Sequence, residues 1–166
     1  MTEPLNVTLR ALARRYTEVA RKELGNQLTS VALYGSVACG DAGPESDIDL
    51  FIVLKRAPVG MFRRRTLWEP VREQLTAELE PLWEQGVYVD FVEVIRTEAE
   101  ARHFHPIYLD MTVGGEVLYD PQGFLEGILQ GVRQRLKVLG ARRRSLGRIS
   151  YWDLKPQFTP GEVIEL

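Results

Sequence analysis

The chain has 166 residues, of which 45% are hydrophobic and 27% are charged, values that are ordinary for one folded domain. Its formal net charge of −2 argues against a large nucleic-acid interface, which usually needs a basic face. No apolar run approaches the roughly 20 residues of a membrane span, and a single cysteine, Cys39, excludes an intramolecular disulfide. The N-terminal stretch lacks the apolar core of a secretory signal, so we expect a cytoplasmic protein.

Apolar residues recur at three- and four-residue intervals between positions 5 and 24, a spacing typical of an amphipathic helix. Gly25 follows the last of them and predicts the end of this helix. The short apolar run Val31–Tyr34 then predicts a strand. Gly35 and Ser36 interrupt that run and indicate a turn.

Asp47 and Asp49 open the next predicted strand, which continues to Leu54 and is rich in β-branched and aromatic residues. Because side chains alternate along a strand, both carboxylates point to one face, with their Cα atoms roughly 6.5–7 Å apart. Phe51 and Val53 share that face, so we expect helices on both sides of the sheet. Two carboxylates this close repel each other, and Mg²⁺, which prefers oxygen ligands, would relieve the repulsion. A solvated pair, or one neutralised by an arginine, is the alternative.

Residues 61–85 are predicted to be helical, with two internal prolines that indicate a kink or a division into two helices. Residues 87–95 are predicted to be the third strand. Strand parity places Asp90 on the face that carries Val92 and places Glu93 on the opposite face. An aspartate among valines on an apolar strand is costly unless it is paired or bound to a metal.

The spacing of Thr97 and Glu100 predicts a helix capping box. Residues 107–113 are a short apolar segment, and residues 116–119 suggest an edge strand. Apolar residues between 124 and 139 then have helical spacing.

The charges are unevenly distributed along the chain. Residues 69–100 hold nine acids and two bases, whereas residues 132–148 hold seven bases and no acid. These stretches are either two solvated faces or two complementary surfaces of a fold or an assembly. The aromatic tail beyond Gly140 is predicted to be extended, and it either folds back on its own domain or docks on another chain.

The string GSVACGDAGPESDIDL, residues 35–50, resembles the signature of the polymerase-β-like nucleotidyltransferases. In that superfamily a Gly-Ser pair follows the first core strand, and a D-x-D motif follows about ten residues later. The string is most similar to the minimal nucleotidyltransferases, which often act as antitoxins with a HEPN-type partner protein. The chain differs from that family at Cys39, where an arginine is common.

This resemblance implies the roles of five residues. Asp47 and Asp49 would bind two Mg²⁺ ions. Gly35 and Ser36 would hold the phosphates of a nucleoside triphosphate, with ATP as the expected donor. Asp90 matches the third carboxylate of the family, so it would be both a metal ligand and the general base that accepts a proton from the acceptor hydroxyl.

The implied fold class is α/β (α+β), with a small mixed β-sheet of the nucleotidyltransferase type packed with helices. We expect a core at residues 1–120, followed at residues 121–166 by a helix and an aromatic, basic tail. The implied reaction moves a nucleoside monophosphate from a triphosphate to an acceptor hydroxyl, such as a tyrosine of a HEPN-type partner. A small aminoglycoside-like acceptor and a non-catalytic, antitoxin-like binding module are the alternatives. The sequence leaves open the acceptor, the nucleotide and homo-oligomerisation.

Overall fold

A computed structural model describes residues 2–147 and 149–165 of the chain. Arg148, one of the seven bases in the basic stretch, lies outside the described residues. Within them, no helix is long and apolar enough to cross a membrane. The elements in chain order are α1 (Thr2–Leu24), the short 3-10 helix η1 (Gly25–Gln27), β1 (Leu28–Tyr34), α2 (Gly35–Cys39), β2 (Ile48–Leu54), α3 (Met61–Glu84), β3 (Phe91–Thr97), α4 (Glu98–Ala101), α5 (Ile107–Gly114), β4 (Glu116–Tyr119), α6 (Phe124–Leu139), β5 (Arg142–Leu146) and β6 (Ile149–Asp153).

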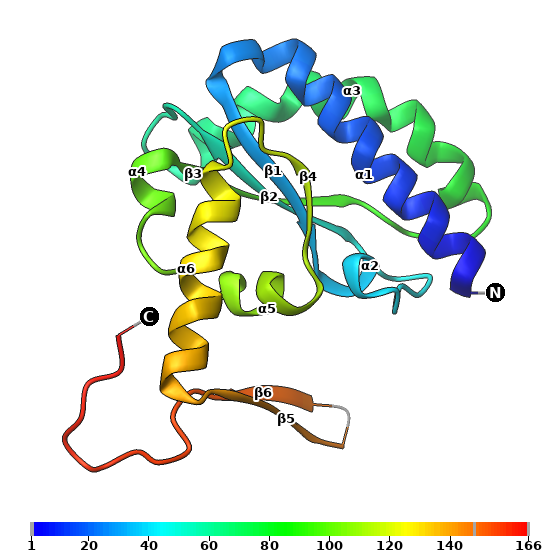
Figure 1. Cartoon of the computed structure of the whole chain (residues 1–166). Coiled ribbons are helices and arrows are strands. Elements are labelled where there is room, and N and C mark those ends of the chain that lie inside the picture. Colours follow the sequence, from blue (N-terminus) through cyan, green and yellow to red (C-terminus); the bar gives the residue numbers. More distant parts are fainter. Residues whose placement is uncertain (1, 148, 166) are drawn as a thin grey trace.

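The main sheet has four strands in the order β3-β2-β1-β4. Strand β1 runs antiparallel to both β2 and β4, whereas β2 and β3 are parallel. Helices α1 and α3 cover one face of this sheet, and α5 and α6 cover the other (Figure 1). The predicted fold class, a small mixed sheet packed with helices, is therefore confirmed.

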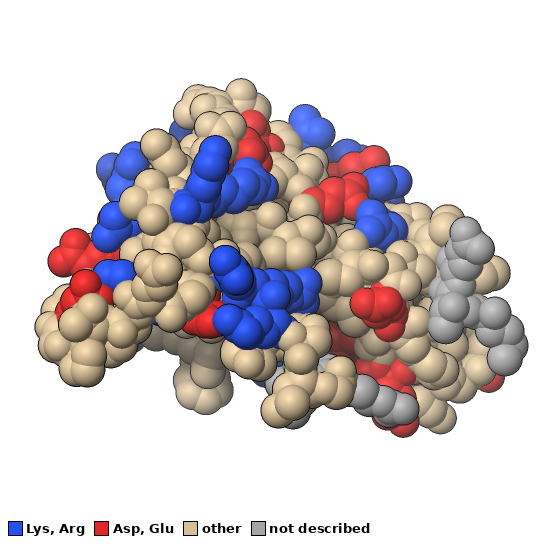
Figure 2. Space-filling model, turned by 60° about the horizontal axis from the view of Figure 1, so that its bottom comes forward, with Lys and Arg blue, Asp and Glu red and all other residues tan. Residues whose placement is uncertain are grey.

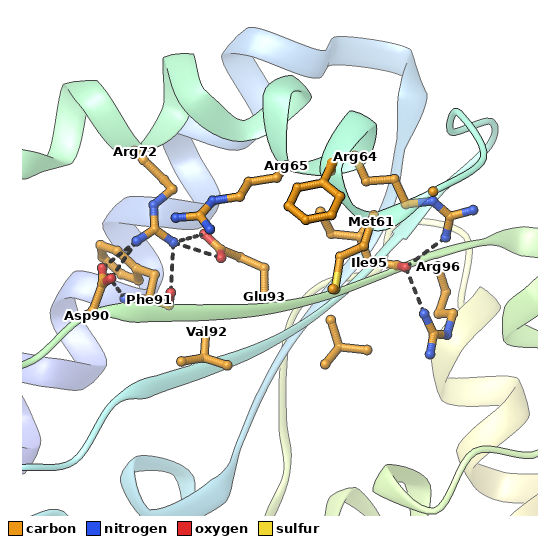
Figure 3. Close-up of a pocket in the computed structure, with 13 residues that line it drawn as sticks. Met61, Arg64, Arg65, Arg72, Asp90, Phe91, Val92, Glu93, Ile95 and Arg96 are labelled. Atoms are coloured by element: carbon orange, nitrogen blue, oxygen red, sulfur yellow. Dashed lines mark hydrogen bonds and ion pairs between the residues drawn. The ribbon is translucent and has the colours of Figure 1, made fainter.

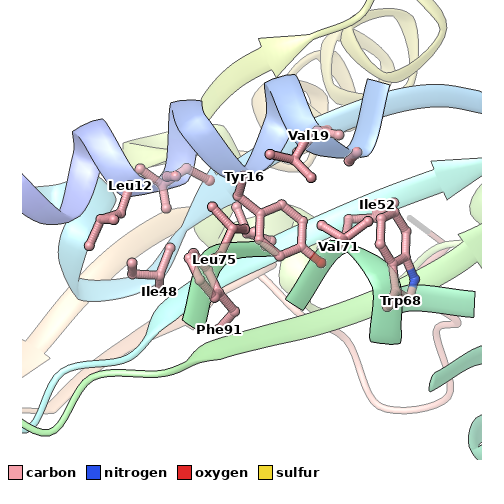
Figure 4. Packing of buried hydrophobic residues seen from close by; sticks show 14 of the residues in the cluster. Leu12, Tyr16, Val19, Ile48, Ile52, Trp68, Val71, Leu75 and Phe91 are labelled. Carbon is pink, nitrogen blue, oxygen red and sulfur yellow. The ribbon is translucent and has the colours of Figure 1, made fainter. Parts of the chain in front are cut away.

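Strand β2 is the centre of the core because its two faces contribute to two different hydrophobic clusters. One face packs beneath α1 and α3, where Tyr16, Trp68 and Leu75 fill the space between the helices and the sheet (Figure 4). The other face packs against α5 and α6 through Phe51 and Val53. The prediction of helices on both faces is confirmed, and Asp49 is the one residue of β2 that is not fully buried.

Helix α3 is continuous from Met61 to Glu84, although Pro70 and Pro81 lie inside it. Both prolines are exposed to solvent. The carbonyl oxygens that lose an N–H partner in the preceding turn therefore face water, which can hydrogen-bond to them. The predicted division into two helices is wrong for this reason.

The segment after β3 contains both a confirmed and an unforeseen element. Thr97 and Glu100 form the predicted capping box of α4. Residues 107–114 form helix α5, in which Tyr108 and Met111 are buried against the sheet. The apolar run is too short to display helical periodicity, so the sequence gives no helix signal there.

The residues beyond Gly140 form an antiparallel hairpin, β5–β6, which is separate from the main sheet. The prediction of an extended tail is right, but it did not include strand pairing. All five residues of β5 are exposed, whereas Trp152 and Leu154 pack against the cluster of α5 and α6. The hairpin lies at the bottom of Figure 1, and Figure 2, which brings this side forward, shows Lys and Arg side chains gathered near the middle of the face.

The burial of α3 gives a stability prediction. Leu75→Ala should lower the free energy of unfolding by about 2–5 kcal/mol, since Leu75 is fully buried and its truncation leaves a cavity. Leu67→Ala on the same helix is the control, because Leu67 is exposed, and it should cost less than about 1 kcal/mol. Urea denaturation measures both values, and equal losses would contradict the packing described here.

Candidate active site

Gly35 lies at the junction of β1 and α2 and has a φ of +72°, a backbone conformation that favours glycine. The carboxylate of Asp49 lies directly against it. A Cβ atom added at Gly35 would lie 2.1 Å from Asp49 Oδ2, which is closer than atoms can approach. The absence of a side chain at Gly35 is therefore what allows the carboxylate to occupy this position.

The strand register explains why these two residues meet. Strands β1 and β2 are antiparallel, and Asp49 pairs with Tyr34, the residue that precedes Gly35. Asp49 is half-buried, and burial, followed by the charge of Asp47, raises its pKa to about 6. Burial, followed by the charge of Asp49, likewise raises the pKa of Tyr34 to about 12. Ionised Asp49 is thus held where its negative charge is unfavourable.

Asp47 lies just before β2 and is exposed. Its Oδ1 atom accepts a hydrogen bond from the backbone N–H of Asp90 at 3.2 Å. On the other side, the backbone N–H of Ile48 donates to the carbonyl oxygen of Asp90 at 2.9 Å. The backbone of residue 90 is therefore joined directly to the segment that carries the two aspartates.

The carboxylate of Asp90 has a different environment. Arg72 of α3 donates to both of its oxygens, at 2.6 and 2.7 Å (Figure 3). The same guanidinium binds Glu93 at 2.9 Å and donates to the carbonyl of Phe91 at 2.8 Å. The side chains of Asp90 and Glu93 thus bind the same arginine. The prediction from strand parity, that they lie on opposite faces of the sheet, is wrong. Alternation is a property of strands, and β3 begins only at Phe91, one residue after Asp90.

Four of the five residues singled out in the sequence lie together in space. Gly35 and Ser36 are consecutive in the first turn of α2, and the carboxylate of Asp49 in β2 lies against Gly35. Asp47, just before β2, is close enough for its charge to contribute to the raised pKa of Asp49. Asp90 joins the group only through its backbone. Within residues 2–147 and 149–165, no three His, Cys, Asp or Glu side chains are arranged to hold a metal ion.

The pair formed by Asp47 and Asp49 has the chemistry that a divalent cation requires. Both residues offer hard oxygen donors, and among the described residues neither carboxylate forms an ion pair with a Lys, Arg or His side chain. An arginine-neutralised pair, the alternative considered from the sequence, is therefore excluded for Asp47 and Asp49. It applies instead to Asp90 with Arg72.

Sequence reasoning missed Arg72, and a signal for it was present. Arg72 is one of only two bases in the acidic stretch of residues 69–100, so many carboxylates compete for it. It also lines a pocket of about 620 Å³ that runs along β3 and contains Arg64, Arg65 and Arg96 as well as Asp90 (Figure 3). Val92, in register with Asp49 on the neighbouring strand, lies in the same pocket. Asp90 lines this pocket, whereas Asp47 and Asp49 do not.

The sequence of the chain is similar to those of known proteins. A family model described as "Nucleotidyltransferase domain" matches residues 15–109, more than half of the chain. A proposed protein adenylyltransferase of Methanocaldococcus jannaschii is 23% identical over 122 residues, which cover 74% of this chain and 79% of that protein.

Two solved structures are also similar to the chain. A toxin–antitoxin with AMP-PNP has 16% identity and a TM-score of 0.46, over 76% of this chain and 92% of that one. The toxin–antitoxin MntA-HepT has 17% identity and a TM-score of 0.43, over 78% and 90%. At these scores the similarity carries no argument about ligands or partners.

The contact between Gly35 and Asp49 gives a second prediction. Gly35→Ala and Gly40→Ala both place a side chain at positive φ, but a Cβ atom meets open space at Gly40 and the Asp49 carboxylate at Gly35. Gly35→Ala should therefore lower the free energy of unfolding more than Gly40→Ala, whose cost should be about 1 kcal/mol. In an Asp49→Ala background the two substitutions should cost nearly the same. Urea denaturation of the single and double variants measures these costs. A difference between Gly35→Ala and Gly40→Ala that persists in the Asp49→Ala background would refute the contact.

The pKa of Asp49 gives a third prediction, for protein in a chelating buffer without divalent cations. The pKa of Asp49 is about 6 in the folded protein, above its ordinary value of 3.8, so folding favours the protonated carboxyl. The contribution of Asp49 to the free energy of unfolding is therefore fully present below about pH 4, and it is lost as the pH rises through 6. Asp49→Asn carries no such charge. The stability of this variant relative to wild type should therefore increase between about pH 4 and about pH 7. A pH-independent difference in thermal midpoint would contradict the raised pKa.

Proposed function

The chain belongs to the nucleotidyltransferase domain family and is a transferase, and we propose that it moves AMP from ATP to a hydroxyl of a partner protein with the help of Mg²⁺. The observation that carries this proposal is the half-buried carboxylate of Asp49, held against Gly35 beside Asp47. No other pair of carboxylates in the described part of the chain combines this repulsion with an adjacent glycine turn.

Gly35 and Ser36 are proposed to bind the β- and γ-phosphates of the nucleotide. The bare backbone at Gly35 lets a phosphate approach closely, and the hydroxyl of Ser36 can donate a hydrogen bond to it. Asp47 and Asp49 would hold two Mg²⁺ ions. When bound, the ions supply positive charge for the transferring phosphoryl group and for the attacking and leaving oxygens.

The reaction breaks the bond between the α-phosphorus and its bridging oxygen to the β-phosphate, and pyrophosphate leaves. A bond forms between the α-phosphorus and the acceptor oxygen, whose proton passes to a carboxylate. Asp90 is proposed to accept this proton, as its match to the third carboxylate of the superfamily implies. The chain's own contribution is mainly to position the reactants and to stabilise charge.

A protein acceptor is supported by the relative from Methanocaldococcus jannaschii, whose name describes a protein adenylyltransferase. The net charge of −2 argues against a polynucleotide acceptor. The resemblance of residues 35–50 to minimal nucleotidyltransferases further predicts that the partner is of the HEPN type. The proposed location of the reaction is the cytoplasm.

The test uses ATP labelled at the α-phosphate, Mg²⁺ and proteins captured with the tagged chain. Asp49→Asn should reduce label transfer to the captured partner at least about a hundredfold, because it removes one charge of the cation-binding pair. Asp41→Asn is the matched control: Asp41 is an exposed aspartate of the same loop, and its variant should transfer label at the wild-type rate.

The same experiment distinguishes the alternatives. Capture of the partner by wild type and Asp49→Asn alike, with no label on either, would favour a non-catalytic binding module. Label on an aminoglycoside but on no protein would favour the small-molecule enzyme.

A further inference from the structure

Arg72 is fixed in place without help from Asp90. Its Nη1 atom donates to the carbonyl of Phe91 at 2.8 Å and to the carboxylate of Glu93 at 2.9 and 3.1 Å. Glu93 has a side chain only 12% exposed, and it also accepts a hydrogen bond from the hydroxyl of Tyr16 at 2.9 Å. A buried carboxylate needs a charged partner. Arg72 therefore has a structural reason to stay beside β3 that does not depend on Asp90.

The bond from Arg72 to Asp90 is of a different kind. It uses the other terminal nitrogen, Nη2, and its acceptor side chain is 54% exposed. Exposed ion pairs contribute little to stability because water competes with them. If Asp90 leaves, Arg72 keeps Glu93, and no buried charge is left without a partner. The two carboxylates on this arginine thus differ, since Glu93 is buried and Asp90 is exposed to water.

The backbone of residue 90 already lies where a third carboxylate would be useful. Its N–H donates to Asp47 and its carbonyl accepts from Ile48. A rotation of the side chain would redirect the carboxylate, and it would also break the hydrogen bond that Asp90 Oδ1 accepts from the N–H of Phe91 at 2.7 Å. Without a cation, a third negative charge beside Asp47 and Asp49 would be repelled by both carboxylates. With a divalent cation bound, the same charge would be attracted.

We propose that Arg72 is a positioning residue that holds the Asp90 carboxylate away from the Asp47–Asp49 pair and releases it when a divalent cation binds there. This inference rests on the proposed function, because the cation is that of the transfer reaction. Arg72 and the cation compete for one carboxylate. The apparent affinity for the cation is therefore lowered by the fraction of molecules in which Asp90 remains on Arg72.

The experiment measures binding of Mn²⁺ to the nucleotide-free protein by electron paramagnetic resonance. Arg72→Lys retains a positive charge for Glu93 but lacks the planar fork that binds two carboxylates. It should tighten Mn²⁺ binding about two- to fivefold, the factor for releasing one exposed ion pair. Asp90→Asn should weaken binding, and Arg72→Lys with Asp90→Asn should bind as Asp90→Asn does, because Arg72 acts only through Asp90.

Arg65→Lys is the matched control. Arg65 lines the same pocket and forms no ion pair with any described residue, so this variant should bind Mn²⁺ as wild type does. Unchanged or weaker binding by Arg72→Lys, or a gain that persists in the double variant, would overturn the role of Arg72. The proposed function would survive that result if wild type binds Mn²⁺ and Asp49→Asn does not. No Mn²⁺ binding by wild type would overturn both.

A second measurement needs no substitution at Arg72. In wild type labelled with ¹⁵N-arginine, Mg²⁺ should shift the guanidinium signal of Arg72, since Asp90 leaves it. The shift should be absent in Asp90→Asn. A signal of Arg72 that Mg²⁺ leaves unchanged in wild type would contradict the release of Asp90, even if Arg72→Lys does not fold.

Discussion

The repulsion between the carboxylates of Asp47 and Asp49 is the interaction on which the proposed chemistry depends. In water such a pair would cost little. Here Asp49 is half-buried against Gly35, and the pKa of its carboxyl rises to about 6. The fold thus maintains an unfavourable negative charge beside a turn with an unobstructed backbone. A divalent cation with a polyphosphate is the kind of ligand that makes this arrangement favourable.

The rest of the architecture keeps that pair in position. The antiparallel register of β1 and β2 brings the turn at Gly35 to the entrance of β2. Helices on both faces of β2 fix the strand, since its alternate residues belong to two different hydrophobic clusters. Helix α3 has two functions. Trp68 and Leu75 belong to the core, while Arg72, between them in sequence, reaches the outer edge of β3 and binds Asp90 and Glu93.

Local patterns predicted much of this arrangement. The composition of β2 predicted cover on both of its faces, and the capping box at Thr97 is formed as expected. The orientation of Asp90 could not be obtained in the same way. Its partner is 18 residues away on another element, and parity fails at a residue that precedes its strand. Helix α5 and the β5–β6 hairpin were also missed, because short segments display too few residues to establish a period.

The measurement that tests the central claim most directly is the pKa of the Asp49 carboxyl, from ¹³C nuclear magnetic resonance of aspartate-labelled protein with Asp49→Asn for assignment. Without divalent cations this carboxyl should titrate near pH 6. With saturating Mg²⁺ and a non-hydrolysable ATP analogue, its pKa should fall below that value, because the cation favours the ionised form. An ordinary pKa that the cation does not change would contradict the account.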